Sequence, residues 1–437
     1  MKPPPAIEIA DIESIDHEGR GVARIGGKAV FVDGALPGES VRLQRIRRKR
    51  RYDEAVVVEV LRPSPLRVTP RCPHFGVCGG CSLQHLDHTA QLAAKGRIVA
   101  EELARIGGVQ PERWLPPLAG PIWSYRRRAR LGSKYVDRKE RVLVGFRERG
   151  SPLLADLGRC EVLAAPVGDL IADLAALIGG LELRRRVAQI EVAVAENVTA
   201  LVLRVLDDPP AADLAALREF ESHHGVALYL QPGGLESVAP LSPPAKPLRY
   251  ALPGLREGIE FAPTDFIQVN GELNRLMVAR ALELLEPRPG DRALDLFCGL
   301  GNFSLPIAGH VAAVTGVEGD AALVGRAEAN AVRNGIENVG FHVANLASES
   351  LQAPWAIERY DLVLLDPPRA GACEILPIAA GSRPRRIVYV SCHAGTFARD
   401  AGILVERLGY RLVAAGIMDM FPHTSHVESI ALFEPAA

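Results

Sequence analysis

The sequence predicts a multidomain α/β protein with a small N-terminal β-barrel, a mixed α+β region in the middle, and a C-terminal domain built on a parallel sheet. The 437 residues are enough for roughly two to four domains. Short strand patterns follow one another without a helical stretch up to about residue 62, whereas apolar strands alternate with helical stretches from about residue 273. With 48% hydrophobic and 24% charged residues, the composition is that of a globular protein, which excludes disordered and fibrous classes.

Charge and hydropathy limit the classes of partner and the cellular compartment that the sequence allows. The 51 Lys and Arg residues nearly balance the 52 Asp and Glu residues, so any basic surface for a nucleic acid must be local. No run of ~18 apolar residues could cross a membrane, and the start, Met1-Lys-Pro-Pro-Pro, lacks the apolar stretch of a signal peptide. We therefore expect a cytoplasmic protein without a membrane partner. In a reducing compartment, three cysteines within ten residues favour a metal site or catalysis over disulfides.

The N-terminal segment predicts a small barrel of the OB type. Its short strands are separated by glycine-containing turns, and Pro63-Ser64-Pro65 forms a natural boundary. Seven basic residues lie between Arg42 and Arg51, and such a run is either a solvated loop or a hairpin that binds phosphates. The predicted strands cover residues 7–12, 21–25, 28–32, 40–45 and 55–60.

Three cysteines in the segment Cys72-Pro-His-Phe-Gly-Val-Cys78-Gly-Gly-Cys81 have the spacing of a metal site. The two glycines allow the chain to wrap around a metal, and a closed tetrahedral set needs a fourth ligand. Cys160 is the leading candidate for that ligand, although His74 or His85 could complete a zinc site instead. Zinc and an iron–sulfur cluster both accept four thiolates, so the spacing leaves the choice between them open.

The middle region carries a basic and aromatic segment. A helical pattern over residues 87–107 ends at Gly107-Gly108, and residues 115–265 mix strands and helices. Residues 121–149 contain ten Lys and Arg against three Asp and Glu, with Trp123 and Tyr125 next to the first arginines. Single-stranded RNA recognition uses guanidinium and aromatic planes, whereas a solvated basic strand pair is the alternative.

The C-terminal domain contains a nucleotide-type loop. Asp295-Leu-Phe-Cys-Gly299-Leu-Gly301-Asn302 follows the first apolar strand, and the second strand ends in Glu318, which can accept hydrogen bonds from both ribose hydroxyls. The third glycine of the dinucleotide pattern is missing, and Asp295 would repel a pyrophosphate but suits a zwitterionic methionine group. We therefore favour S-adenosylmethionine over NAD as the ligand. The predicted strands cover residues 292–297, 312–317, 339–343, 360–365 and 386–390, with a late antiparallel pair at 412–418 and 426–433.

Further residues at the carboxyl ends of the predicted parallel strands indicate which reaction the site could catalyse. Asp366-Pro-Pro-Arg369 ends the fourth strand and Cys392 ends the fifth, at the edge where open α/β folds bind ligands. A thiolate beside a methyl donor suits addition to carbon 6 of uracil, which makes carbon 5 nucleophilic. Glu428, at the start of the last strand, is the candidate base for the carbon-5 proton, and a salt-bridging role fits the sequence equally well. His423 and His426 lack a third metal ligand nearby, so we interpret them as packing or RNA-contacting residues.

Together these residues resemble the RNA uracil-5-methyltransferase family, and within it the branch that methylates 23S ribosomal RNA and carries a TRAM domain and a [4Fe-4S] cluster. Transfer-RNA enzymes of the family lack both features, and a related ribosomal enzyme has the cluster alone. Because the sequence carries the patterns of both the TRAM domain and the cluster, it resembles the branch named for uracil 1939 of 23S ribosomal RNA. The segments that carry the resemblance are residues 72–81, 266–270, 295–304, 366–371, 391–392 and 418–429.

The resemblance implies a domain order and a set of functional residues. It implies a TRAM barrel in residues 1–66, a central iron–sulfur domain in 67–265 whose helix near 87–107 packs on the catalytic domain, and a Rossmann-like, S-adenosylmethionine-dependent methyltransferase domain in 266–437. It makes Cys392 the nucleophile and Glu428 the base of a monomeric enzyme whose partner is 23S ribosomal RNA. The implied donor contacts are Gln268, Phe297, Asn302, Glu318, Asn345 and Asp366, and the implied cluster ligands are Cys72, Cys78, Cys81 and Cys160.

One departure from the family and three alternatives stay open. His393-Ala-Gly follows the nucleophile where the family often has Asn-Pro, which leaves the geometry of this loop undetermined. The first alternative is uracil-5-methylation of another ribosomal or transfer RNA uridine, and the second is a NAD-dependent oxidoreductase. The third is a non-catalytic RNA-binding protein with a vestigial methyltransferase domain, against which the presence of both Cys392 and Glu428 argues.

Overall fold

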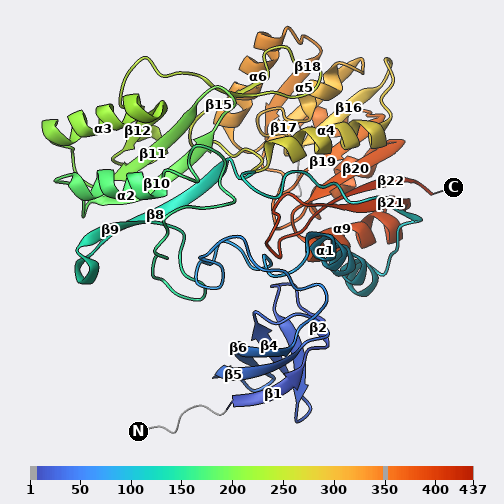
Figure 1. Cartoon of the computed structure of the whole chain (residues 1–437). Coiled ribbons are helices and arrows are strands. Elements are labelled where there is room, and N and C mark those ends of the chain that lie inside the picture. The colour runs from blue at the N-terminus through green and yellow to red at the C-terminus, as the bar shows by residue number, and fades with distance from the viewer. Residues whose placement is uncertain (1–6, 348–352, 437) are drawn as a thin grey trace. The chain divides into compact units, whose positions relative to one another are not determined.

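The computed structural model describes residues 7–347 and 353–436, which form two compact units. The first unit contains residues up to Ile98 together with Phe146–Ala155 and Phe421–His426, and the second contains Val99–Gly145, Asp156–Met420 and the residues from Val427 onwards. Figure 1 follows the chain through both units by colour. No helix in the described ranges is long and apolar enough to cross a membrane. The division into domains at 1–66, 67–265 and 266–437 stays a prediction.

The first unit is built on a six-stranded sheet with the strand order β1-β5-β6-β4-β3-β2. Val30 and Val32 on β4 are fully buried and pack with Val41 and Leu43 of β5, because alternate residues of a strand point to the same face. The five predicted strands are confirmed, and the two-residue strand β2 is additional. Their bounds are β1 Ile7–Asp11, β2 Ser14–Ile15, β3 Gly21–Ile25, β4 Lys28–Asp33, β5 Ser40–Arg48 and β6 Tyr52–Arg62.

A C-terminal segment is held within the first unit by the chain that follows the cysteine motif. The carbonyl of His423 accepts hydrogen bonds from the amides of Ser82 and Leu83, both at 2.9 Å. Gln91 of helix α1 (His88–Glu102) accepts from the amide of His423 at 2.9 Å, and Lys95 donates to the carbonyl of Phe421 at 3.0 Å. His423 is buried, in agreement with the packing interpretation. The predicted helix over 87–107 is confirmed as α1 followed by the π-helical turn η1 (Leu103–Gly107).

The second unit contains two large sheets, of which the first, called the central sheet here, has the order β13-β12-β11-β10-β8-β9. Strands β11 and β12 pair in parallel, and the other neighbours are antiparallel. A small hairpin of β14 (Leu248–Tyr250) and β15 (Ile259–Phe261) follows. The other bounds are β8 Arg128–Val136, β9 Arg141–Gly145, α2 Ile171–Gly180, β10 Val187–Val194, β11 Thr199–Val205, α3 Ala211–His224, β12 Val226–Gln231 and β13 Ala239–Pro240, with the short turns η2 Asp137–Lys139 and η3 Leu235–Ser237.

The second large sheet, called the C-terminal sheet here, has the order β18-β17-β16-β19-β20-β22-β21-β7. Its first five strands are parallel, and β22 runs antiparallel to both β20 and β21, which confirms the predicted parallel sheet with a late antiparallel pair. The carboxyl ends of the five parallel strands therefore share one edge. The strand bounds are β7 Arg113–Trp114, β16 Arg292–Leu296, β17 Ala313–Glu318, β18 Val339–Val343, β19 Leu362–Leu365, β20 Arg386–Ser391, β21 Tyr410–Met418 and β22 Glu428–Pro435.

Helices connect the parallel strands, as the alternating pattern predicts, and Figure 1 shows this alternation along the second half of the chain. Asn270 caps the first of them by accepting a hydrogen bond from the amide of Leu273 at 3.1 Å. The helix bounds are α4 Gly271–Leu285, α5 Ser304–Ala308, α6 Ala321–Asn334, α7 Pro354–Ile357, α8 Leu376–Gly381 and α9 Ala394–Glu406.

Candidate active site

The loop after β16 turns sharply over the carboxyl end of the strand. Gly299 and Gly301 have φ angles of +54° and +86°, in the left-handed region that glycine enters without a steric penalty. Phe297 has a φ angle of 66° in the same region, which is costly for a residue with a side chain and is typical of functional sites. Its amide donates to the carbonyl of Val317 at 2.9 Å. The loop is thus fixed to the neighbouring strand β17.

Glu318, at the end of β17, is fixed by three backbone amides. Its Oε2 accepts from the amide of Gly299 at 3.1 Å. Its Oε1 accepts from the amides of Gly319 at 2.7 Å and Asp320 at 3.1 Å. A carboxylate has about four lone-pair positions, so acceptor capacity is left on this side chain. The geometry suits hydrogen bonds from a pair of ribose hydroxyls.

Asp295 lies buried beneath the glycine loop. One oxygen accepts a hydrogen bond from the hydroxyl of Ser304, while no donor in the described part of the chain pairs with the buried Oδ1. Burial raises the pKa of Asp295 to about 7, and the negative charges of Asp366 and Glu318 contribute to the increase. An orphaned acceptor in an acidic environment fits a ligand with an ammonium or sulfonium charge and does not fit a pyrophosphate. The residues present therefore fit S-adenosylmethionine.

Asn302 and Gln268 are fixed by residues outside the glycine loop. The amide group of Asn302 exchanges two hydrogen bonds with Asn274 of α4, at 2.9 and 3.0 Å, and accepts a third from the hydroxyl of Tyr250 at 3.1 Å. The carbonyl of Gln268 accepts from Nε of Arg127 at 2.7 Å. The sixth predicted donor contact, Asn345, is exposed beyond β18, where its side chain accepts from the amide of Ala347 at 3.1 Å.

Strand pairing brings Cys392 and Glu428 together. Ser391, the last residue of β20, is paired with Ser429 of β22 in antiparallel register, so Cys392 follows this pair on one chain segment and Glu428 precedes it on the other. Glu428 is 7% exposed, and Cys392 is partly exposed. Because β20 ends at this point, the thiol and the carboxylate lie at the edge that also carries Asp366.

The charges of Cys392, Glu428 and Asp366 interact with one another. Burial raises the pKa of the Cys392 thiol to about 11, with further increases from Glu428 and Asp366 and an opposing effect of Arg369. Burial, followed by the charge of Glu428, raises the pKa of Asp366 to about 7. Two carboxylates and a thiol thus form one electrostatically coupled group, in which each negative charge disfavours the next.

His393, the residue after Cys392, has a structural role that the sequence did not reveal. The Nδ1 atom of His393 accepts a hydrogen bond from the amide of Thr396 at 3.3 Å, so the imidazole caps helix α9. The amide of His393 donates to the hydroxyl oxygen of Ser391 at 3.1 Å, which closes the turn around Cys392. The sequence His393-Ala-Gly, which departs from the family pattern, therefore places Cys392 directly before the cap of helix α9.

Residues of α9 that no motif indicates hold the loop that begins at Asp366. Arg399 donates to the carbonyl of Ala370 at 2.8 Å. Asp400, which is fully buried, accepts from the amide of Ala372 at 2.7 Å and from the hydroxyl of Tyr389 at 2.6 Å. An aspartate on the buried side of an otherwise apolar helix is the signal by which the sequence could have identified this role.

The predicted cluster ligands are divided between the two units. Cys72, Cys78 and Cys81 belong to the first unit and Cys160 to the second. The amide of Gly80 donates to Sγ of Cys78 at 3.4 Å, and such N–H···S contacts are used by cysteine ligands of iron–sulfur clusters. Within residues 7–347 and 353–436, no three Cys, His, Asp or Glu side chains form a group that could hold a metal ion. The donor chemistry of these four thiols fits a cluster.

Of the two histidines considered as zinc ligands, His85 has a clear packing role. Its ring lies 5.2 Å from that of Phe75, between ring centroids, and the residue is 1% exposed. Burial lowers its pKa to about 4, and the positive charge of Arg67 contributes to the decrease. The imidazole is therefore neutral at physiological pH and packs against the cysteine motif.

Ion pairs neutralise part of both basic segments. Arg45 is paired with Glu8 and Asp53, and Arg128 and Arg130 bind Glu191 at 2.9 and 2.8 Å. The exposed basic residues at the end of β5 and in the turn to β6 are Arg47, Arg48, Lys49, Arg50 and Arg51. Two of them, Arg47 and Lys49, form ion pairs with Glu54 at 3.4 and 3.3 Å. The sequence alone could not show which of these charges are paired.

Known proteins share both the sequence and the fold of this chain. The family model of tRNA (uracil-5-)-methyltransferases matches residues 257–435, and the model of the TRAM domain of tRNA (uracil(54)-C(5))-methyltransferase matches residues 9–66. The 23S rRNA (uracil(1939)-C(5))-methyltransferase RlmD of Alkalilimnicola ehrlichii is 53% identical over 98% of this chain and 97% of its own, and that of Methylococcus capsulatus is 52% identical over 99% and 98%. The crystal structure of Pyrococcus abyssi tRNA (uracil-54, C5)-methyltransferase with S-adenosyl-L-homocysteine has the same fold, with a TM-score of 0.74 and 24% identity over 98% of this chain and 100% of that one.

The fold and these relatives define an S-adenosylmethionine-dependent RNA uracil-5-methyltransferase with an N-terminal TRAM domain. Within this class, the chain belongs to the family of the 23S rRNA (uracil(1939)-C(5))-methyltransferases.

The coupling between Glu428 and the thiol predicts a change in the reactivity of Cys392. Replacing Glu428→Gln removes a negative charge that raises the thiol pKa, so the thiolate fraction near pH 8 should increase. Because the thiolate is the nucleophile, alkylation of Cys392 by iodoacetamide should become roughly threefold to tenfold faster, measured by peptide mass spectrometry. Glu434→Gln, at the far end of β22, is the control and should leave the rate unchanged. An equal or lower rate in Glu428→Gln would show that the two groups are not coupled.

Proposed function

We propose that the protein transfers a methyl group from S-adenosylmethionine to carbon 5 of a specific uridine in 23S ribosomal RNA. The observation that carries this proposal is the register of β20 and β22, which places Cys392 and Glu428 directly beyond the Ser391–Ser429 pair, at the edge of the sheet that also holds the glycine loop. The relatives that match nearly the whole chain are named for uracil 1939 of 23S ribosomal RNA, which supports this substrate. The alternative is another uridine in ribosomal or transfer RNA.

The proposed reaction begins with addition of the Cys392 thiolate to carbon 6 of uracil. The new carbon–sulfur bond converts the ring to an enolate whose carbon 5 attacks the methyl group. Glu428 then takes the proton from carbon 5, the carbon 5–carbon 6 double bond forms again, and the thiolate leaves. The low exposure of Glu428 supports this role, because a carboxylate that is shielded from water is a stronger base.

The methyl donor is proposed to bind at the carboxyl edge of the C-terminal sheet. S-adenosylmethionine supplies the methyl group as an electrophile bound to a sulfonium. Glu318 is fixed to receive ribose hydroxyls, and Asp295 supplies an unpaired acceptor below the loop. The proposed contacts are Gln268, Phe297, Asn302, Glu318, Asn345 and Asp366.

RNA is proposed to contact the turn between β5 and β6 and the basic strand β8. Arg48, Arg50 and Arg51 are exposed at that turn, and the basic segment 121–149 includes the exposed Lys134 of β8. Exposed basic side chains bind phosphates without reading sequence, so these contacts would supply affinity. The monomeric state expected from the sequence stays a prediction.

Cys72, Cys78, Cys81 and Cys160 are proposed to hold a [4Fe-4S] cluster. Four thiolates are the ligand set of such a cluster, and the N–H···S contact of Gly80 supports a ligand role for Cys78. A structural role in the unit that contains residues 421–426 is the simplest function for it, because Ser82 and Leu83 follow Cys81 directly.

Two variants separate the nucleophile from the base. Cys392→Ala should abolish both methylation and covalent attachment, because carbon 5 never becomes nucleophilic without thiolate addition. Glu428→Gln should methylate carbon 5 once and then stop, because the proton stays and the thiolate cannot be expelled. The variant should therefore migrate in a denaturing gel as a protein–RNA adduct that contains the labelled methyl group.

The outcomes of this experiment are distinct. Normal turnover by Glu428→Gln would place the base elsewhere. A Glu428→Gln protein that binds RNA but forms neither adduct nor product would place Glu428 before methyl transfer and contradict the proposed order.

Metal analysis tests the cluster. Protein purified without oxygen should be brown and contain about four iron and four acid-labile sulfide per chain, as expected for a cluster of this type. Cys81→Ser should lose most of both, whereas the control Cys373→Ser, a cysteine outside the proposed set, should keep them. One zinc per chain without sulfide would show that the site is a zinc site.

A further inference from the structure

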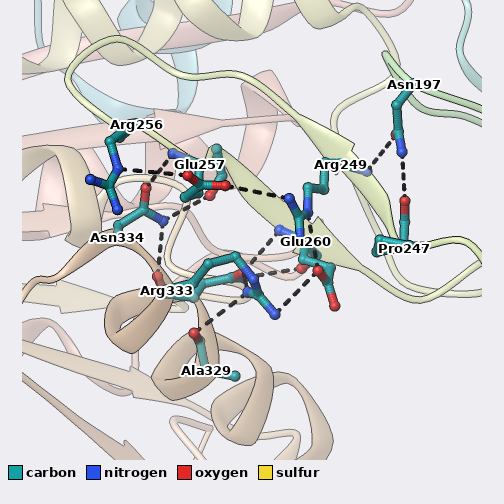
Figure 2. Close-up of polar contacts among 11 residues, drawn as sticks. Asn197, Pro247, Arg249, Arg256, Glu257, Glu260, Ala329, Arg333 and Asn334 are labelled. Atoms are coloured by element: carbon teal, nitrogen blue, oxygen red, sulfur yellow. Dashed lines mark hydrogen bonds and ion pairs between the residues drawn. The ribbon is translucent and has the colours of Figure 1, made fainter.

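The hairpin of β14 and β15 is bonded to the central sheet. The side chain of Asn197, in the turn between β10 and β11, donates to the carbonyl of Pro247 at 2.7 Å and accepts from the amide of Arg249 at 3.2 Å. The carbonyl of Arg249 in turn accepts from the amide of Glu196 at 2.9 Å. Figure 2 shows Asn197 reaching the hairpin from the side opposite to helix α6. The start of the hairpin is therefore fixed by the central sheet.

The other side of the hairpin is bonded to α6, which follows Glu318. The side chain of Asn334 accepts from the amide of Glu257 and donates to the carbonyl of Gly258, both at 2.9 Å, and Arg333 pairs with Glu260 at 3.1 Å (Figure 2). Asn330, which is fully buried, accepts from the amide of Glu260 at 2.9 Å. The hairpin thus connects the central sheet to the domain that carries the glycine loop.

Tyr250, the last residue of β14, contacts one proposed donor contact, Asn302, directly and a second, Gln268, through Arg127. Its ring is 3% exposed, and its hydroxyl donates to Oδ1 of Asn302 at 3.1 Å. The guanidinium carbon of Arg127 lies 4.5 Å from the ring centroid, while Nε of the same arginine donates to the carbonyl of Gln268 at 2.7 Å. Burial raises the pKa of Tyr250, so the hydroxyl keeps its proton and stays a donor.

The hydrogen bonds of Asn302 show how the contact with the Tyr250 hydroxyl orients its side-chain amide. Its Oδ1 accepts from both Tyr250 and Asn274, and its Nδ2 donates one hydrogen to Asn274. An amide nitrogen has two hydrogens, so one is left for a ligand, in a direction fixed by the other contacts. Loss of the tyrosine hydroxyl would leave one side of Asn302 unrestrained.

Arg127 connects Tyr250 to Gln268, the second proposed donor contact. It is 6% exposed, and no acceptor in the described part of the chain pairs with its Nη2 atom. The charge is therefore stabilised mainly by the carbonyl of Gln268 and by the face of Tyr250, as in a buried cation–π pair. Its amide also donates to the carbonyl of Val269 at 2.8 Å, immediately before strand β8.

We propose that Tyr250 and Arg127 are positioning residues of the methyl-donor site, which hold Asn302 and Gln268 in the orientation that binds the donor. This inference rests on the proposed function, because it takes both residues as donor contacts. If it is correct, the affinity for the donor depends on the hairpin and the central sheet, which are both distant from the glycine loop in the sequence.

Titration calorimetry with S-adenosylhomocysteine on the full chain tests the inference. Tyr250→Phe removes a single oxygen and should weaken binding roughly fivefold to tenfold, the value of one hydrogen bond. The KM for the donor should rise by a similar factor, while the affinity for RNA stays unchanged. Arg127→Met, which keeps the volume but loses the charge and the donor, should weaken binding further.

Tyr360→Phe is the matched control. This tyrosine is 6% exposed and donates to the carbonyl of Trp355 at 2.9 Å, before the start of β19 and so at the opposite edge of the sheet. It loses the same buried hydroxyl and should keep wild-type affinity. Wild-type affinity in both Tyr250→Phe and Arg127→Met would overturn the inference, as would equal weakening in the control. Failure of the wild-type protein to bind S-adenosylhomocysteine would instead contradict the proposed function.

Discussion

The antiparallel pairing of β20 with β22 is the constraint on which the candidate active site depends. The pairing of Ser391 with Ser429 brings the neighbouring residues Cys392 and Glu428 to the same end of the two strands, although 36 positions separate them in the numbering. A shift of one residue would move Glu428 to the other face of the sheet, because side chains alternate along a strand. The buried partners of both strands, such as Val390 and Ile430, hold this register.

The candidate active site carries several acidic side chains, although the proposed reaction requires the thiolate form of Cys392. Asp295 and Asp366 both have pKa values raised to about 7, and that of Cys392 is raised to about 11. A cationic sulfonium in such a site is favoured by the carboxylates and would itself favour the thiolate. Burial and the two carboxylates therefore favour the protonated form of the Cys392 thiol.

The sequence predicted the fold closely because the relevant patterns are local. Five uninterrupted apolar strands gave the parallel sheet, and the residues that end them, including Asp295, Glu318 and Asp366, could be placed at one edge without coordinates. The roles of Tyr250, Arg127 and Asn274 could not be found in this way, because they arise where segments far apart in the chain meet. Arg127 lies in the basic segment 121–149, for which the sequence offered RNA recognition or a solvated strand pair, whereas the structure buries its side chain.

For the cysteine motif, the sequence predicts the kind of site but not its complete ligand set. The spacing of Cys72, Cys78 and Cys81 predicts a metal site, and Cys160 is the leading candidate for the fourth ligand, with His74 and His85 as alternatives. Cys160 lies far along the chain and belongs to the other compact unit, so the spacing of the first three cysteines could not decide between these ligands. Likewise, the division of residues 121–149 into buried, paired and exposed arginines depends on partners such as Glu191.

Mapping of 5-methyluridine in 23S ribosomal RNA tests the central claim most directly. Cells that lack the gene would be complemented with either the wild-type protein or the Cys392→Ala variant. We expect a single uridine to lose its methyl group in the deletion and to regain it only with the wild-type protein. Methylation that does not depend on the protein, or that Cys392→Ala restores, would contradict the claim that this site methylates ribosomal RNA through Cys392.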